Sequence, residues 1–465
     1  MKKEVSKTEI FETVPVPKAI LSLAVPTIIS QMISVIYNLA DAFYVGRTGD
    51  SYKIAGVSLC LTIFMMTIAF ANLFGIGGGS LVARLLGRKD PEEAKKASAF
   101  AFYGAACTAV LYSALLAVFL DPLLKALGAS EATIGFARQY VIPVVIIGGI
   151  PNILNMVMAH LLRNAGYSKQ ASMGLSGGGV CNIILDPLFM FVLFPKGQEV
   201  LAAGIATMVS NFGACIYLLI TYGKVARTAP ISLDLRLARS VRRGTVKELF
   251  SIGIPTFVLT SLFDAANIVF NARIAAHGDL QLAAAGIVMK IERIPNAVNV
   301  GICQGMMPIV AYNYSSGNHA RMRETVRTAR LMGLGVSAAC VILLFLLARP
   351  VSAAFISQSA GAEEALVTLG FAIAYLRIRC FASPVQFMNY HSSYCLQAVG
   401  DGRGTLLHAV FRDLVFYIPM MIGFDLLWQE TGLMLALPVG EACGGLFALW
   451  LLTRRLKKDR REDQA

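Results

Sequence analysis

Apolar stretches long enough to cross a lipid bilayer recur along the whole of this 465-residue sequence. A spanning helix needs about 20 mostly apolar residues, because the hydrocarbon core of a bilayer is about 30 Å thick. Apolar residues make up 56% of the chain and charged residues only 15%, which disfavours disordered, secreted disulfide-rich and ordinary soluble proteins. We therefore predict an all-α integral membrane protein with twelve transmembrane helices. The expected spans are 17–40, 53–80, 94–120, 132–160, 166–195, 199–223, 247–274, 280–312, 323–348, 364–397, 404–428 and 431–453.

Lysine and arginine are distributed unevenly between the two sides that these spans define. With the N-terminus inside, the inner segments hold 29 of them and the outer segments hold seven. Because short cytoplasmic loops retain positive charge, we expect a multi-pass membrane protein with both termini in the cytoplasm. The net charge of +13 then reflects topology and contact with anionic lipid, so nucleic-acid binding is not expected.

The first span follows three basic residues, Lys2, Lys3 and Lys7, as the apolar part of a signal peptide would. It lacks a convincing small-residue cleavage site, so we interpret it as a retained span. The nine cysteines include no CxxC pair, and neither a disulfide framework nor a zinc site is indicated.

The two halves of the sequence resemble each other, which predicts an internal duplication. Each half holds six spans, and an even number makes the repeats parallel. We predict a six-helix lobe at 1–223, a cytoplasmic linker at 224–246 and a second six-helix lobe with a basic tail at 247–465. The matching positions, at offsets of 229 or 230, are Pro26 with Pro255, Asn38 with Asn267, Gly56 with Gly286 and Gly75 with Gly305.

Two six-helix lobes around a central cavity are typical of an alternating-access carrier. A duplicated scaffold or receptor that moves nothing is the alternative. Pro26 interrupts the hydrogen bonds of the first span about four turns before Asp41, and we expect it to act as a hinge.

Two acidic residues, Asp41 and Asp186, stand within the spans of the first half. An ionised side chain at mid-membrane costs at least about 2.5–3.5 kcal/mol, so it usually lines a cavity or a coupling site. Two carboxylates with Asn and Thr oxygens could hold Na⁺. They could instead bind and release protons, because burial beside a like charge favours the neutral form. The alternative is that Asp41 is solvated and structural at its helix end. The polar residues expected around this pair are Gln31, Tyr37, Asn38, Tyr140, Asn155, Asn182 and Thr207.

The second half carries its own intramembrane charges. Asp264, Lys290 and Arg293 form a possible second coupling site, but we favour internal ion pairs that stabilise the lobe. Lys290, Arg293 and Arg412 are the natural partners for Asp264 and Glu441.

The signatures of a P-loop ATPase and of a zinc protease are missing from the sequence. It contains no GxxxxGK[ST] and no HExxH. We expect no enzyme activity and no cofactor other than H⁺ or Na⁺ as coupling ion.

Several stretches resemble the multidrug and toxic compound extrusion (MATE) family, in particular its DinF-like bacterial branch. They are VPTIISQMISVIYNLADAFYVGRTG (25–49), FGIGGGSLVARLLGRKDPEEA (74–94), LRNAG (162–166), NIILDPLF (182–189), AAGIATMVS (202–210), GIPTF (253–257) and GICQGMMPIVAYNYSSGN (301–318). The resemblance implies two six-helix lobes facing a central cavity. It also implies a coupling-cation site made of Asp41, Asn182, Asp186 and Thr207, with Tyr37, Tyr140 and Asn155 nearby.

The predicted function is an antiporter that admits H⁺ or Na⁺ and expels amphipathic, cationic organic compounds. It would work in the lipid bilayer as a monomer, without an obligate protein partner. A flippase for a lipid-linked precursor is the alternative, and it requires a strongly basic cavity. The residues that could supply one are Lys290, Arg377, Arg379 and Arg412.

Overall fold

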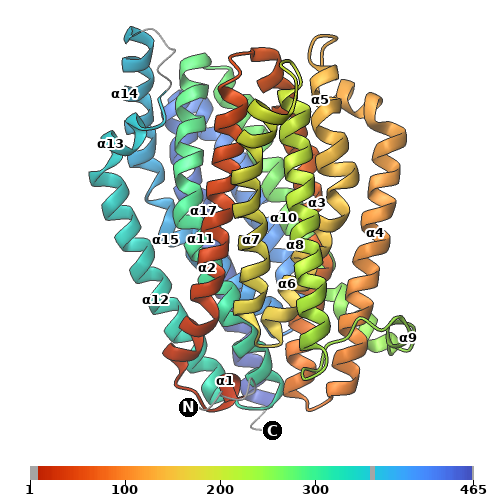
Figure 1. The fold of residues 1–465 in the computed structure, drawn as a ribbon. Helices are drawn as coiled ribbons and strands as arrows, with labels where there is room; N and C mark the ends of the chain where they lie inside the picture. The colour runs from red at the N-terminus through yellow and green to blue at the C-terminus, as the bar shows by residue number, and fades with distance from the viewer. Residues whose placement is uncertain (1–8, 357–361, 463–465) are drawn as a thin grey trace, which may run out of the picture.

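The computed structural model describes residues 9–356 and 362–462, and every regular element within them is a helix. The long helices stand side by side in one upright bundle, with α1 and the last turns of α17 at the same end (Figure 1). We call this the terminal end. Lys2, Lys3 and Lys7, and the side chains of the basic tail beyond residue 457, lie outside what the structure describes.

The first half of the bundle contains six spans, two of which continue through a π-helical turn. The helices are α1 (Glu9–Glu12), α2 (Val16–Gly46), α3 (Ser51–Gly87), α4 (Pro91–Ala126), α5 (Ile134–Val141), η1 (Ile142–Ile147), α6 (Gly149–Asn164), α7 (Ser168–Leu188), η2 (Phe189–Leu193) and α8 (Glu199–Val225).

A short helix, α9 (Leu235–Arg239), lies in the connection to the second half. The helices that follow are α10 (Arg243–Ala275), α11 (Asp279–Ser315), α12 (His319–Leu346), α13 (Ala348–Ala353), α14 (Ala362–Arg379), α15 (Ala382–Ala398), α16 (Gly402–Val410), η3 (Phe411–Tyr417) and α17 (Ile418–Glu462).

The helices account for twelve crossings. Eight are long and apolar enough to cross a membrane, and ten spans result when two bent pairs count as one span each. The bent pairs cover 134–164, with a bend of 43°, and 363–398, with a bend of 47°. The 37-residue α11, which carries charges at its middle, is the eleventh. The stretch Gly402–Lys457 supplies two spans, because its backbone leaves helical geometry at Trp428 and Gln429. The prediction of an all-α, twelve-helix fold is confirmed.

The two halves share a hydrophobic core only near the terminal end. One buried cluster there combines Ala24 of α2 with Ile252 of α10 and Met306 of α11. Towards the opposite end the cores are separate, one built from residues 45–203 and the other from residues 266–437. The halves are therefore two lobes that are closed against each other at one end and parted at the other.

Glycines allow this closure. A Cβ on Gly305 of α11 would stand only 2.6 Å from the backbone nitrogen of Ala24, and a Cβ on Gly253 of α10 would collide with the carbonyl oxygen of Leu73. Small residues let helix backbones approach this closely inside a membrane. An ion pair between Arg88 and Glu248, 3.0 Å apart, joins the same two lobes at the terminal end.

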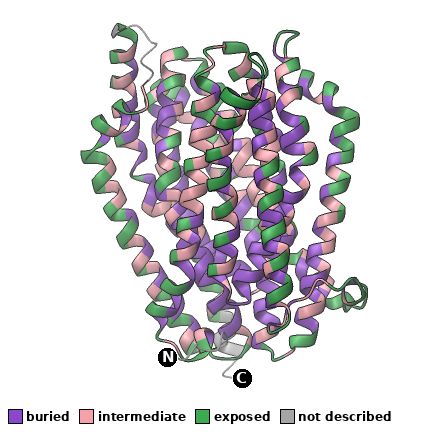
Figure 2. Cartoon of the chain, in the orientation of Figure 1, coloured by how far each residue is buried: buried purple, intermediate pink, exposed green. Residues whose placement is uncertain are grey.

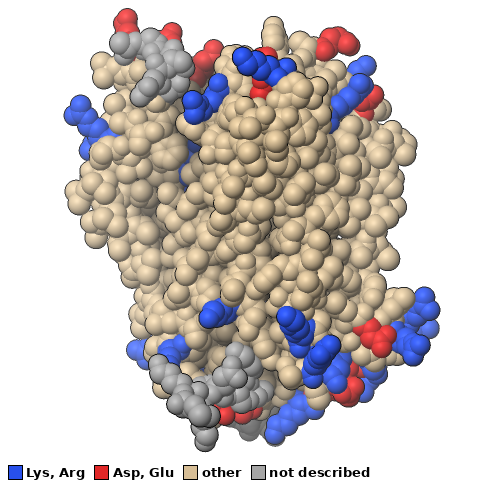
Figure 3. Space-filling view, viewed as in Figure 1, with Lys and Arg blue, Asp and Glu red and all other residues tan. Residues whose placement is uncertain are grey.

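The surface matches a bilayer. Figure 3 shows Lys, Arg, Asp and Glu gathered at the two ends of the visible face, with a broad band of other residues between them. Many large apolar side chains of the described helices are exposed, such as Ile184, Val192 and Leu426. Figure 2 shows buried residues concentrated in the bundle interior, with exposed ones on its outer helices.

Candidate functional site

The four side chains expected to bind the coupling cation come from three helices of the first lobe. Asp41 lies near the end of α2. Asn182 and Asp186 lie on one face of α7, and Thr207 lies on α8. Asn182 Nδ2 donates hydrogen bonds to Asp186 Oδ1 at 3.0 Å and to Thr207 Oγ1 at 3.1 Å. The Asp41 and Asp186 carboxylates are close enough for their charges to interact.

Tyr140 of α5 orients Asp41. Its hydroxyl donates a 2.6 Å hydrogen bond to Asp41 Oδ2, and the tyrosine is itself 8% exposed. Asp41, Tyr140, Thr207 and Tyr37 line one cavity of about 190 Å³, which we call the small cavity. Asp41 is therefore partly buried and faces a small cavity, which disfavours the alternative of a solvated residue at the helix end.

Three oxygen atoms at this site are buried without a hydrogen-bond donor. They are Oδ1 of Asp41, Oδ1 of Asn182 and Oδ2 of Asp186. Leaving such acceptors unpaired costs free energy, so a partner is expected. A Na⁺ ion, which prefers oxygen ligands, or a proton would supply that partner. No three His, Cys, Asp or Glu side chains in the described ranges could hold a metal together, so Na⁺ here would depend on amide and hydroxyl oxygens as well.

A larger cavity of about 480 Å³ lies between the two lobes, and we call it the central cavity. Gln31 and Asn38 of α2 line it, as we expected, together with Asp264 of α10 and Arg293 of α11. Four further amides line this cavity and were not predicted as site residues, although an amide inside an apolar span was a usable signal. They are Asn267, which the sequence analysis named only as the repeat counterpart of Asn38, and Asn271, Asn296 and Gln386.

Asn155 lies deeper than predicted. It is 3% exposed on α6, and its Nδ2 donates to the carbonyl oxygen of Asn211 at 3.0 Å. It lines neither the small nor the central cavity. Its side chain therefore joins α6 to α8 and does not face the cavity in this conformation.

Pro26 sits inside a continuous helix, because α2 runs unbroken from Val16 to Gly46. The carbonyl oxygen of Leu23 accepts hydrogen bonds from the hydroxyls of Thr27, at 2.9 Å, and Ser168, at 2.6 Å. Pro26 lacks the N–H that would bond the carbonyl of Ser22, and these two hydroxyls supply donors at the neighbouring carbonyl of Leu23. The hinge role of Pro26 stays a prediction.

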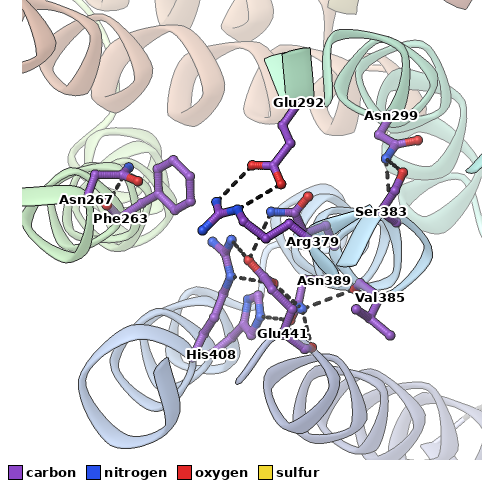
Figure 4. A network of polar contacts seen from close by, with 12 residues as sticks. Phe263, Asn267, Glu292, Asn299, Arg379, Ser383, Val385, Asn389, His408 and Glu441 are labelled. Carbon is purple, nitrogen blue, oxygen red and sulfur yellow. Dashed lines mark hydrogen bonds and ion pairs between the residues drawn. The ribbon is translucent and has the colours of Figure 1, made fainter. Parts of the chain in front are cut away.

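The charges of the second lobe form two buried ion pairs (Figure 4). Arg412 Nη2 lies 2.6 Å from Glu441 Oε1, with both side chains 3% exposed, which confirms the predicted partnership. Arg379 Nη2 lies 2.8 Å from Glu292 Oε2. Asp264 makes no ion pair in the described part of the chain, so its predicted pairing with Lys290 or Arg293 is wrong for this conformation. The side chain of Arg293 is too far away for a direct bond, although its charge still acts on Asp264.

The sequence of this chain was compared with those of known protein families and proteins. The profile of the MatE family matches residues 26–188 and 254–422. "Multidrug export protein MepA" of Staphylococcus aureus strain MRSA252 is 29% identical over 456 residues, 97% of each chain. The protein of that name from Staphylococcus saprophyticus is 28% identical over 455 residues, again 97% of each chain.

Solved structures share the fold. A crystal structure of MATE in complex with MaL6 superposes with a TM-score of 0.90 at 24% identity, covering 98% of this chain and 100% of the other. An outward-facing conformation of a multidrug resistance MATE family transporter gives a TM-score of 0.89 at 24% identity and the same coverage. Since the family profile matches well over half of the sequence, the chain belongs to the MatE family of multidrug and toxic compound extrusion transporters.

Proposed function

We propose that this transporter is a cation-coupled antiporter that exports amphipathic, cationic organic compounds. The observation that carries the proposal is the set of buried, donor-free oxygens on Asp41, Asn182 and Asp186 beside a cavity between two lobes. A cation or proton bound there, and an organic compound bound in the central cavity, would both act on the balance between two lobe arrangements. The relatives named above are multidrug export proteins, which supports this class of substrate.

The arrangement of the lobes supports alternating access. They pack together at the terminal end and are separate at the other, so the structure has the form of one end state. If the terminal end is cytoplasmic, as the distribution of Lys and Arg predicts, this state faces outward. We place the protein in the bacterial plasma membrane in that orientation, acting as a monomer.

Either H⁺ or Na⁺ suits the coupling site, and no other cofactor is proposed. The carboxylates of Asp41 and Asp186 would carry a proton, whereas Na⁺ would also draw on Asn182 and Thr207. Charge neutralisation at this site is the step that coupling requires in either case.

The flippase alternative is not favoured. Among the four basic residues that it required, Arg412 is held in a buried ion pair with Glu441, and Arg379, which lines the central cavity, is neutralised by Glu292. Arg377 lines neither cavity. The multidrug export relatives point the same way.

The test is dye efflux from liposomes that contain purified protein, with a pH gradient and a Na⁺ gradient imposed separately. Efflux that one gradient drives, and that Asp41→Asn abolishes, is the expected result and would name the ion. Efflux of equal rate in Asp41→Asn would contradict the proposal, and so would a wild type that moves no dye under either gradient.

A further inference from the structure

Among the cationic side chains that line the two cavities, two are left without an ion-pair partner in the described ranges. Arg379 lines the central cavity and is neutralised by Glu292, and Arg412 nearby is neutralised by Glu441. Lys290 and Arg293 of α11 are exposed, and no hydrogen bond or ion pair of either side chain occurs in the ranges that the structure describes.

These two side chains face the cavities and not the lipid. Both line the small cavity opposite Asp41, although they belong to the other lobe. Arg293 also lines the central cavity with Asp264. Lys290 and Arg293 are three residues apart, so they lie on one helix face about one turn apart. A pair of cations in this position presents two adjacent positive charges to whatever enters between the lobes.

Other residues that line the central cavity could bind the cationic and apolar parts of a transported compound. Asp264 Oδ2 is buried without a donor, which leaves one unpaired acid in the central cavity, a cavity that Arg293 lines as well. Apolar side chains of both lobes complete the lining, among them Met65, Phe263 and Met289. A cavity with separated unpaired charges of both signs and an apolar surface fits an amphipathic zwitterion.

An unpaired charge at membrane depth is costly and is retained mainly where it has a function. In this chain the pairing of Arg379 and Arg412 shows that neutralisation inside the lobe is available to an arginine of the same helix bundle. Lys290 and Arg293 are not neutralised in this way. An anionic group of a bound solute would neutralise their positive charges through charge-assisted hydrogen bonds.

We propose that Lys290 and Arg293 form a binding site for an anionic group of the transported compound, a carboxylate, sulfonate or phosphate. This inference rests on the proposed export function and narrows its substrates to amphipathic compounds in which a cationic or aromatic body carries an acid group. Asp264 faces the cationic part, and Lys290 with Arg293 binds the acid.

The test uses two rhodamine dyes that share one cationic ring system. The ethyl ester carries a single positive charge, and the free carboxylic acid is a zwitterion at neutral pH. Equilibrium binding of each dye to purified protein in phosphatidylcholine vesicles is measured by fluorescence anisotropy. We expect the double variant Lys290→Gln/Arg293→Gln to bind the acid at least about tenfold more weakly than the wild type does, with ester binding unchanged.

Two further variants keep the result interpretable. Arg377→Gln removes an exposed arginine of α14 that lines neither cavity, and it should bind both dyes like the wild type. Arg293→Lys keeps the charge and should retain preference for the acid. If the double variant does not fold, Arg293→Gln alone should show a smaller loss of acid binding.

An acid-to-ester affinity ratio that is the same in the wild type and the double variant would overturn the proposal, and so would a wild type that does not bind the acid. Adding phosphatidylglycerol tests a lipid phosphate as the source of the anion. Competition that depends on both residues would assign the pair to a lipid headgroup and overturn the assignment to a transported compound. Dye efflux is recorded separately, so that a failure of export is distinguished from a failure of the anion site.

Discussion

Tyr140 donates a 2.6 Å hydrogen bond to one oxygen of Asp41, while the other oxygen of that carboxylate is buried without a donor. The two residues are 99 positions apart in the chain and belong to α5 and α2. The tyrosine therefore holds the carboxylate in place and leaves Oδ1 for a proton or a cation. One oxygen of Asp41 is thus used for positioning, and the other is the atom to which we assign the proposed coupling role.

Replacing the coupling carboxylate should abolish export without unfolding the protein. Asp41→Asn keeps the size of the side chain and its acceptor for Tyr140 but loses the charge that a cation would neutralise. Drug resistance of cells that express the variant should fall to that of cells without the transporter. The control is Asp121→Asn, which removes a carboxylate from an exposed pair with Arg138. Full resistance in Asp41→Asn would show that coupling lies elsewhere.

Removing the positioning bond should weaken coupling without abolishing it. Tyr140→Phe deletes one hydrogen bond to a charged group, an interaction worth about 1.5–3 kcal/mol. The Na⁺ concentration that gives half-maximal efflux should rise about tenfold or more, whereas the half-maximal H⁺ concentration should fall, because the lost bond favoured the charged carboxylate. Gradient-driven efflux from liposomes at a series of Na⁺ concentrations and pH values measures it. An unchanged ion dependence would mean that the Asp41 side chain needs no orientation by the tyrosine.

The ion pair between Arg412 and Glu441 should be a major support of the second lobe. Arg412→Ala leaves Glu441 charged and buried, and we expect a loss of stability of about 3–5 kcal/mol. The double variant Arg412→Met/Glu441→Gln should recover part of this loss, because it leaves no unpaired charge and retains an acceptor for Asn389. The melting temperature in detergent is the measurement.

An exposed ion pair serves as the comparison. Arg138 and Asp121 have side chains 45% and 50% exposed, and such surface pairs contribute about 0–1 kcal/mol. Arg138→Ala should therefore change the melting temperature much less than Arg412→Ala. Equal effects of the two variants would argue against a special role for the buried pair.

The closure at the terminal end depends on glycine. A side chain at Gly253 would press on the Leu73 carbonyl of the other lobe, so Gly253→Val should weaken this closure and favour lobe separation there. Hydrogen exchange should become faster in peptides that cover residues 70–80 and 249–256. Gly335→Val is the matched control, since a Cβ at Gly335 meets open space. Unchanged exchange in Gly253→Val would show that the lobes tolerate the added bulk.

The proposed coupling site shows which contacts could be predicted from the sequence. Asn182 and Asp186 are four positions apart, and helix geometry alone puts them on one face, as the structure shows with a 3.0 Å hydrogen bond. Asp41 and Thr207 were candidates from their position inside the spans, and the family resemblance implied that they join Asn182 and Asp186 in one cation site. Their place depends on how α2, α7 and α8 pack, and local spacing contains no information about that packing.

In the second lobe, an ion pair expected from the sequence is not formed. Asp264 and Arg293 have opposite charges in neighbouring spans, and their pairing was a reasonable expectation. Arg379 instead pairs with Glu292, and Arg412 with Glu441, while Asp264 remains without an ion-pair partner in the described ranges. Which charges meet is decided by the rotation of each helix about its own axis, and several rotations satisfy the same apolar pattern.

The sequence by itself determined the membrane class and the twelve spans, and it predicted the duplication and the orientation. The class and the spans follow from local quantities, namely the length and hydropathy of each segment compared with the thickness of a bilayer. Only the tertiary structure decided that Asn155 faces away from the cavity, that α2 continues as a helix through Pro26, and that Lys290 and Arg293 lie between the lobes without an ion pair in the described ranges. Those outcomes depend on contacts between helices far apart in the chain, where glycines and side-chain shape, rather than hydropathy, determine which faces meet.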